Sequence, residues 1–226
     1  MSSVGRRRLH DERTRANLLS AAECLVAEGG IDAVGVRAVA VRAGTTTRAV
    51  YALFGSKEEL VQALAQRTYG LMMQRIATVP LTSDPGRDLI TGTVWGFRMF
   101  ALDHPDLFRL FFTAQLPRPP LSTESNESRL AALGLLLERV ERAHSAGLLG
   151  GHSVEEVTLL WDALCTGLAM RETCGVILPS EGERIWTDAL DALLIGLGSL
   201  EEARTSMTAN RENPRTTRGT RRAPAV

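Results

Sequence analysis

The sequence has few of the features that mark several common protein classes. Lysine occurs once, at Lys57, among 26 basic residues, and the three cysteines form no CxxC pair. An odd number of widely spaced cysteines indicates neither a disulfide scaffold nor a zinc site. The sequence also contains no GxSxG motif and no phosphate-binding GxxxxGKS/T loop. These absences argue against a serine hydrolase and a P-loop nucleotidase.

Long apolar runs are missing as well. Runs such as Ala192–Leu197 and the longer 130–137 are far too short to span a bilayer, and the N-terminal arginines are not followed by the apolar segment of a signal peptide. We therefore expect a cytoplasmic protein with no membrane partner. The hydrophobic fraction of 44% is still typical of a globular protein, and 226 residues are enough to bury a sizeable core.

Charge is distributed unevenly along a chain whose formal net charge is +0. Residues 1–60 carry nine basic and seven acidic side chains, whereas residues 61–202 carry eleven arginines against eighteen acidic side chains. Residues 203–226 carry six arginines against a single glutamate. The basic ends are compatible with a polyanionic partner, although charge alone does not establish one.

Apolar residues recur at helical spacing almost throughout the chain. Capping signals at Asp84, Ser56–Glu59, Ser153–Glu156 and Ser180–Glu183 mark helix starts, and glycine or proline marks most ends. We expect an all-α protein with nine helices and no strand, at about 11–28, 36–43, 47–53, 57–79, 85–102, 105–112, 127–146, 154–173 and 181–203. The tail, which is rich in arginine, threonine and proline, is expected to be disordered.

The most informative segment is 36–60, VRAVAVRAGTTTRAVYALFGSKEEL. A helix-turn-helix needs a small residue where its two helices cross and a glycine, usually with positive φ, in the turn. Ala40 and Gly44 stand four residues apart in those places, and Thr46 can cap the second helix. The apolar face that the pair would bury consists of Val39, Ala43, Val50 and Leu53.

This segment closely resembles the tetracycline-repressor family, whose pattern runs roughly IAxxAG(V/T)(S/T)xxx(L/V)YxxFx(S/T)KxxL. The residues that match are Val39, Ala40, Ala43, Gly44, Thr45, Thr46, Val50, Tyr51, Phe54, Ser56, Lys57 and Leu60. The resemblance implies a homodimeric transcription regulator that binds a palindromic operator in double-stranded DNA. It also implies repression as the commoner mode, with release by a small apolar or amphipathic ligand. We expect no enzymatic activity, no cofactor and no metal.

The resemblance implies a division of the chain into functional parts. Residues 1–10 form a basic arm, residues 11–56 a three-helix DNA-binding domain with the helix-turn-helix, and residues 57–203 a helical bundle for ligand binding and dimerisation. Residues 204–226 form the basic tail. The segments DHPDLFRLFF and LWDALCTGLAMRE also resemble a subgroup with a Trp…His-Gly motif, with Thr166 standing where the histidine would be.

The resemblance assigns roles within the DNA-binding segment. Thr46, with the amides that begin its helix, Tyr51 and Lys57 would meet phosphates. Residues 47–49 occupy the exposed first turn of the recognition helix, and Arg48 is best placed to contact a guanine. Two departures weaken the match, because Gly35 replaces the usual Thr or Ser cap and Leu53 replaces a frequent phosphate-binding histidine. The predicted DNA-binding set is Arg37, Thr46, Thr47, Arg48, Ala49, Tyr51 and Lys57.

The second half of the chain supplies candidates for the ligand pocket and the dimer interface. The expected pocket residues are soft or aromatic side chains with two polar anchors, namely Met72, Trp95, Arg98, Met99, Phe108, Phe112 and His144. The last two helices carry wide apolar faces, which family members pair with their two-fold mates as a four-helix bundle. The expected interface residues are Trp161, Leu164, Leu168, Trp186, Leu190, Leu194 and Leu197.

Two other functions remain open from the sequence. Glu141 and His144 have the Glu-x-x-His spacing of half a di-iron site, so a helical metalloenzyme is one alternative, although the sequence holds no second such motif. A helix-turn-helix protein that responds to a protein partner instead of a small molecule is the other.

Overall fold

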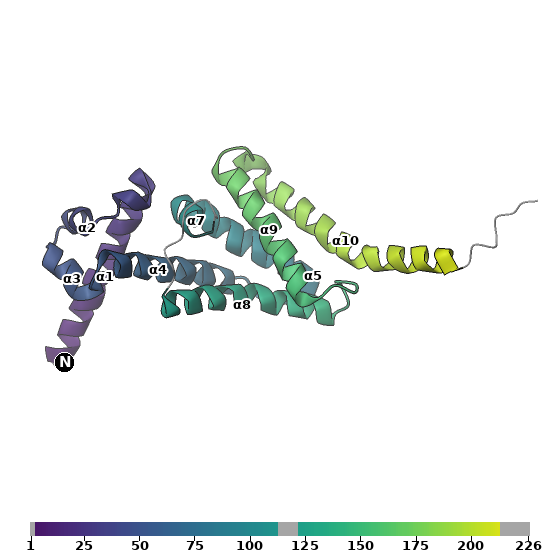
Figure 1. Cartoon of the computed structure of the whole chain (residues 1–226), viewed down its shortest axis with the longest axis horizontal. Helices are drawn as coiled ribbons and strands as arrows, with labels where there is room; N and C mark the ends of the chain where they lie inside the picture. Colours follow the sequence, from purple (N-terminus) through teal and green to yellow (C-terminus); the bar gives the residue numbers. More distant parts are fainter. Residues whose placement is uncertain (1–2, 113–121, 213–226) are drawn as a thin grey trace, which may run out of the picture.

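The computed structural model describes residues 3–112 and 122–212. Regular structure in these two stretches is entirely helical, which confirms the expected all-α fold class (Figure 1). If α5, η2 and α6 are taken as one bent helix, the described residues form nine helices, as predicted.

The first helices gather at one end of the molecule, on the left in Figure 1. Helix α2 packs against both α1 and α3, and a short 3-10 turn, η1, joins α1 to α2. The bounds of these elements are α1 Ser3–Gly29, η1 Ile31–Ala33, α2 Val36–Arg42 and α3 Thr47–Phe54.

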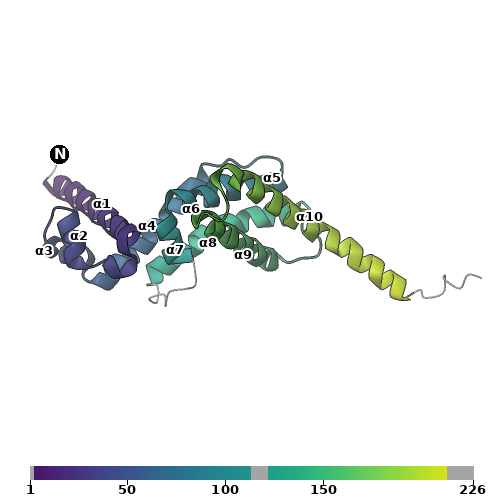
Figure 2. The ribbon, with the colours of Figure 1, turned by 90° about the horizontal axis from the view of Figure 1, so that it is seen from above.

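The remaining helices form a larger bundle. Helix α4 leads into it from the first group, and the view from above shows the two groups set apart along this helix (Figure 2). The segment η2 between α5 and α6 is π-helical. The bounds are α4 Lys57–Ala77, α5 Pro85–Gly92, η2 Thr93–Arg98, α6 Met99–Asp103, α7 Pro105–Phe112, α8 Thr123–Ser145, α9 Val154–Thr173 and α10 Pro179–Glu212.

Local sequence signals fix most helix starts. The capping box expected before α9 is confirmed, because Ser153 Oγ accepts from Glu156 N and the Glu156 carboxylate accepts from Ser153 N, both at 3.2 Å. Asp84 caps α5, whose first residue is proline. The box expected at Ser180 is wrong, since α10 begins one residue earlier, at Pro179, and Ser180 lies inside the helix.

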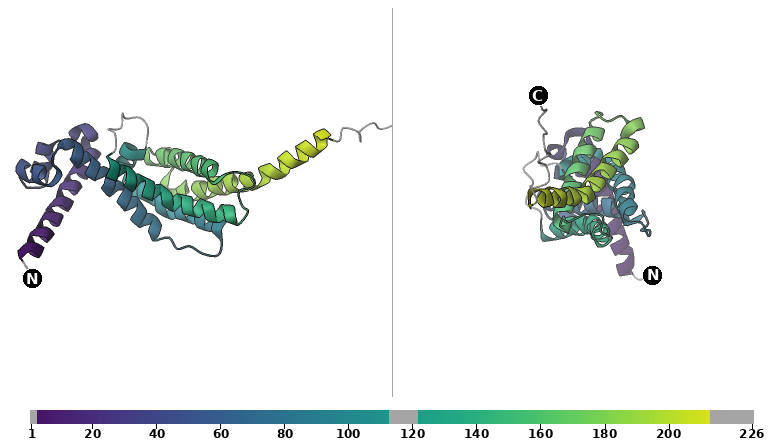
Figure 3. Two further views of the ribbon diagram at one scale, coloured as in Figure 1. Left: turned by 60° about the horizontal axis from the view of Figure 1, so that its bottom comes forward. Right: turned by 90° about the vertical axis from the view of Figure 1, so that its right-hand side faces the viewer.

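Three helices are longer than the sequence analysis expected. Helix α8 begins at Thr123, and α1 begins at Ser3, so the supposed arm is helical from residue 3. Helix α10 runs to Glu212 and projects beyond the bundle (Figure 3), which corrects the expectation of a disordered tail from residue 204. Few large apolar residues lie in this part of the chain, but a helix can continue because no glycine or proline interrupts the sequence between Gly198 and Pro214. The rest of that tail lies outside the described residues.

Gly44 shapes the turn between α2 and α3. Its φ is +64°, in the left-handed region that side chains with a Cβ adopt at a cost, and the Thr45 amide donates to Ala40 O at 2.9 Å across the turn. A Cβ at Gly44 would meet no atom within 4 Å, so the backbone conformation alone selects glycine. The positive φ predicted from the sequence is confirmed.

Gly44→Ala should therefore destabilise the protein by about 1–2 kcal/mol. Gly70→Ala is the matched control, because Gly70 lies inside α4 with nothing within 4 Å of an added Cβ. There the same change should stabilise the protein by about 0.5–1 kcal/mol, because alanine loses less conformational entropy than glycine when the helix forms. Urea unfolding at fixed protein concentration measures both, and shifts of the same sign would contradict the role of the turn.

Candidate functional site

The helix-turn-helix has a buried side and an exposed side. Of the expected apolar face, Val39 and Val50 are fully buried, whereas Ala43 and Leu53 are half-buried and pack against the core. Ala40, the small residue expected where the two helices cross, is 2% exposed. Thr46 Oγ1 accepts from the Ala49 amide at 3.2 Å, so Thr46 is the N-cap of α3 as predicted. The N-cap of α2 is Gly35, which offers no side-chain bond.

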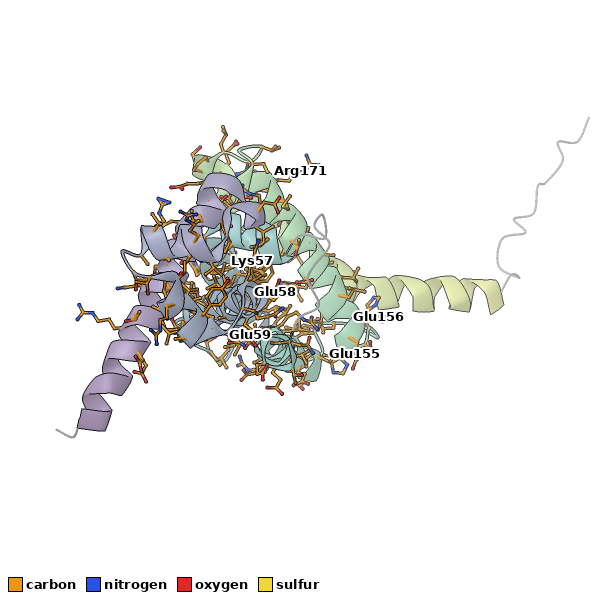
Figure 4. The ribbon with its side chains drawn as sticks, turned by 60° about the vertical axis from the view of Figure 1, so that its left-hand side comes forward. Lys57, Glu58, Glu59, Glu155, Glu156 and Arg171 are labelled. Atoms are coloured by element: carbon orange, nitrogen blue, oxygen red, sulfur yellow. The ribbon has the colours of Figure 1, made fainter. Side chains whose placement is uncertain are left out.

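The predicted DNA-binding residues lie on α2, on α3 with its N-cap, and at the start of α4, and most of them are exposed. Tyr51 is 55% exposed. Ala49 is half-buried and the other six residues of the set are exposed. Lys57 begins α4, next to α3, and is labelled in Figure 4. In the first turn of α3, Thr47 and Arg48 are therefore exposed to solvent, whereas Ala49 is not fully exposed, contrary to the sequence prediction.

Two charged contacts brace this unit against α1. The Arg42 guanidinium donates to both oxygens of Glu28, at 2.6 and 2.5 Å, and so ties the end of α2 to the end of α1. Arg15 lies over the ring of Phe54, 5.0 Å from its centroid. These contacts join α2 and α3 to the long helix α1.

A cavity of about 190 Å³ lies in the larger bundle. Helices α4, α7, α8 and α9 and the segment around η2 contribute its walls, and most of the lining is aromatic or aliphatic. Of the predicted pocket residues, Met72 and Phe112 line it. Burial raises the pKa of the Cys165 thiol, so this lining residue is a neutral side chain.

The other five predicted pocket residues do not line this cavity, which corrects the sequence analysis. Trp95 is 47% exposed, His144 is exposed at the end of α8, and Phe108 is buried among aromatic rings. Met99 is half-buried outside the lining. A π-helical turn holds more residues than an α-helical one, so α-helical spacing across η2 misassigns which side chains face inward.

Arg98, expected as a ligand anchor, is already paired. Its Nε and Nη2 donate to the Glu172 carboxylate at 2.9 and 2.7 Å, and the Trp186 indole N–H donates to the same carboxylate at 2.8 Å. The side chains of Arg98 and Glu172 are 7% and 2% exposed. A Cβ at Gly182 would overlap this carboxylate. The cluster joins η2, α9 and α10 and leaves Arg98 no role in the cavity.

Arg98→Met should destabilise the protein by about 3–5 kcal/mol, because it leaves the Glu172 charge buried without its partner. Arg75→Met is the control, since the Arg75–Asp103 pair is solvent-exposed and its loss should cost about 0–1 kcal/mol. Urea denaturation at fixed protein concentration compares them. If the free energy of unfolding falls by the same amount in both variants, the buried pair contributes no more to stability than the exposed pair.

The sequence analysis missed the polar residues that do line the cavity. Arg139 is 5% exposed, and Thr93 Oγ1 accepts a hydrogen bond from the Trp161 indole at 2.9 Å. Arg129 lines the cavity as well. A signal for Arg139 was present, because it follows Leu135 and Leu136 and precedes Ala143 on the apolar face of its helix.

The predicted dimer interface needs correction too. Trp161, Trp186 and Leu190 are 0% exposed and Leu197 is 2% exposed in the single chain, so these side chains have no surface left for a partner. Their apolar faces complete the core of the same chain. The other three predicted interface residues are half-buried: Leu164, Leu168 and Leu194.

Helices α9 and α10 nevertheless present large apolar side chains to solvent. Leu159 and Ile195 are 69% and 67% exposed, and Leu160 is 45% exposed. Gly167 and Gly196 lie on the same two helices, and an added Cβ at either would meet no atom within 4 Å. Exposed apolar and small residues together are typical of a contact surface.

The described part of the chain holds neither a cluster of metal-ligating side chains nor a helix that could span a membrane. Within it, no three histidine, cysteine or acidic side chains gather to hold a metal ion, so Glu141 and His144 have no third ligand. None of its helices is both long and apolar enough to cross a membrane.

Both halves of the chain match known protein families. Residues 18–64 match the family of bacterial regulatory proteins called the tetR family, and residues 90–193 match the tetracyclin repressor-like C-terminal domain. The HTH-type transcriptional repressor NicS of Pseudomonas putida is 26% identical over 151 residues, which are 64% of this chain and 70% of NicS.

Solved structures share the fold. A protein of unknown function from Rhodococcus sp. RHA1 has a TM-score of 0.68 and 23% identity, covering 82% of this chain and 95% of its own. The regulator FadR from Bacillus subtilis, solved with stearoyl-CoA, has a TM-score of 0.67 and 17% identity, covering 80% of this chain and 98% of its own. The chain therefore belongs to the tetR family of bacterial regulatory proteins and is a DNA-binding transcription regulator.

Proposed function

We propose that this regulator is a repressor that binds a palindromic operator as a homodimer and is released when a small molecule fills the cavity. Helix α4 is the observation that carries the proposal. It begins at Lys57 beside the recognition helix, and its residues Tyr69, Met72 and Ile76 line the cavity. A ligand that moves α4 therefore moves the DNA-binding unit as well. Because its partner is chromosomal DNA, we place the protein in the bacterial cytoplasm.

A second link joins the two parts of the molecule. Glu23 on α1 accepts from His104 Nδ1 at 2.9 Å, at the end of α6, and lies 3.6 Å from the Arg67 guanidinium on α4. A shift of α6 or α4 would reach α1 through this carboxylate. The protein then has two dimer states that differ in the spacing of their recognition helices.

Operator binding requires the two recognition helices to enter successive major grooves, about 34–36 Å apart. A ligand that binds the other spacing better depletes the DNA-binding state. The ligand can shift the equilibrium between the two states only by as much as its affinities for them differ. In this scheme Thr46, Tyr51 and Lys57 position the protein on phosphates, and residues 47–49 meet base edges.

Arg48→Ala and Tyr51→Phe should weaken DNA binding in different ways. Tyr51→Phe removes one hydroxyl donor, so it should cost roughly 1 kcal/mol for operator and random DNA alike. Arg48→Ala should relax preference at one base pair of each half-site, worth about 1–3 kcal/mol. Affinities for an operator selected from random DNA and for its single-base variants, at fixed salt, measure both. A uniform loss for Arg48→Ala would make Arg48 a phosphate contact, and failure to select any palindrome would contradict the proposal.

The homodimer forms, in this proposal, through the exposed face of α9 and α10 that holds Leu159, Leu160, Gly167, Ile195 and Gly196. Leu159→Arg and Ile195→Arg should give monomers, because each would bury a charge near its own two-fold copy. Leu81→Arg, which changes an exposed leucine in the loop before α5, should leave the assembly unchanged. Light scattering reports the mass, and unchanged dimers in both interface variants would exclude this face.

A further inference from the structure

The cavity contains a guanidinium for which the described residues supply no counter-ion at hydrogen-bond distance. Arg139 is 5% exposed and lines the cavity, and its Nε has no hydrogen-bond partner. Its other nitrogens donate only to backbone carbonyls, to Val79 O at 3.1 Å, Leu135 O at 3.4 Å and Ile76 O at 3.5 Å. Among the described residues, no carboxylate lies within 4 Å of it.

The nearest acidic groups do not supply the missing partner. Glu138 and Asp88 attract Arg139 only from a distance. Glu138 is exposed, and the Asp88 carboxylate is held by Arg142 Nη1 at 2.6 Å and by Thr82 at 2.7 Å. Burial lowers the pKa of Arg139, yet an arginine side chain stays protonated in proteins. A buried, unpaired cation with an open donor is costly unless something else provides the negative charge.

We propose that the effector of this regulator is a small organic anion whose acidic group pairs with Arg139 and whose apolar body fills the cavity. The proposal rests on the proposed function, in which this cavity is the effector site, and it adds the chemical class of the ligand. A carboxylate suits the site because its two oxygens can accept parallel hydrogen bonds from two N–H groups of one guanidinium.

The volume and the lining of the cavity limit what the rest of the ligand can be. A cavity of about 150 Å³ with apolar walls holds benzene, so the 190 Å³ found here suits one ring or a short chain with its acid group. Most of the other lining residues are apolar, among them Tyr69, Leu136 and Phe112, and the lining also includes the acidic residue Asp162. The other lining arginine, Arg129, already donates to Asn126 at 3.0 Å. It lies ten residues from Arg139, about 15 Å along α8.

Arg139 also connects the site to the moving helix. The carbonyls that it contacts, of Ile76 and Val79, lie at the end of α4 and just beyond it. On the opposite side, a Cβ at Gly92 would overlap Nε, so glycine is what leaves room for the guanidinium beside η2. An anion that draws the guanidinium toward the cavity therefore pulls on the end of α4.

The test compares anions with neutral molecules of matched shape, using calorimetry on the full-length protein. The probes are benzoate with benzyl alcohol, and hexanoate with hexanol. Wild-type protein should bind each anion at least tenfold more tightly than its alcohol. Arg139→Gln should remove that preference while changing the affinity for the alcohols less than about threefold. Arg87→Gln, which alters an exposed arginine on α5, should leave both affinities unchanged.

Arg139 also donates to backbone carbonyls, and Arg139→Gln removes those bonds as well. The preference of the wild-type protein for anions over alcohols therefore tests the inference without any variant. Alcohols that bind as tightly as the anions, or anions whose binding Arg139→Gln leaves intact, would overturn the inference. So would the failure of every probe to bind. Operator release is measured separately with the same probes. Anions that bind through Arg139 but never release DNA would overturn the proposed function and leave the anion site standing.

Discussion

Helix α4 is the constraint on which the rest of the structure depends, because it is buried in two groups of helices at once. Its first turns, with Leu60 and Leu64 fully buried, pack against α1 and α3, while its later turns pack against α7, α8 and η2. Since protein interiors are close-packed, a displacement at one end cannot be absorbed within the helix. The same geometry that holds the two parts together makes the cavity able to influence the recognition helix.

The buried charged side chains of the bundle differ in whether another side chain pairs with them. Arg98 is matched by Glu172 and Trp186, and burial of Asp88, which alone would raise its pKa, is outweighed by hydrogen bonds from Thr82 and Arg142 that hold this pKa below its ordinary value. Both clusters fasten helices to one another. Arg139 differs, because its only acceptors are carbonyls and its Nε faces none. In this bundle, therefore, two of the buried charged clusters are fully hydrogen-bonded, and the third has an unpaired donor.

The fold was predictable where it depends on neighbouring residues, and the candidate site only in part. The turn glycine Gly44, the cap Thr46 and the capping box at Ser153 act within one helical turn, so their spacing identifies them. Pocket residues were harder to predict, because the π-helical segment η2 breaks the spacing that placed Trp95 inside. A wide apolar face also did not reveal whether Trp186 meets its own chain or a partner.

The sequence by itself determined the helical class, the helix-turn-helix and the membership of a family of DNA-binding regulators, since each follows from short-range patterns that any chain of this type must satisfy. Only the tertiary structure decided which arginine is paired. Arg98 pairs with Glu172 at a separation of 74 residues, whereas no carboxylate among the described residues lies within 4 Å of Arg139. The reason is physical: an ion pair depends on where two helices cross, and the spacing of residues along either helix does not contain that information.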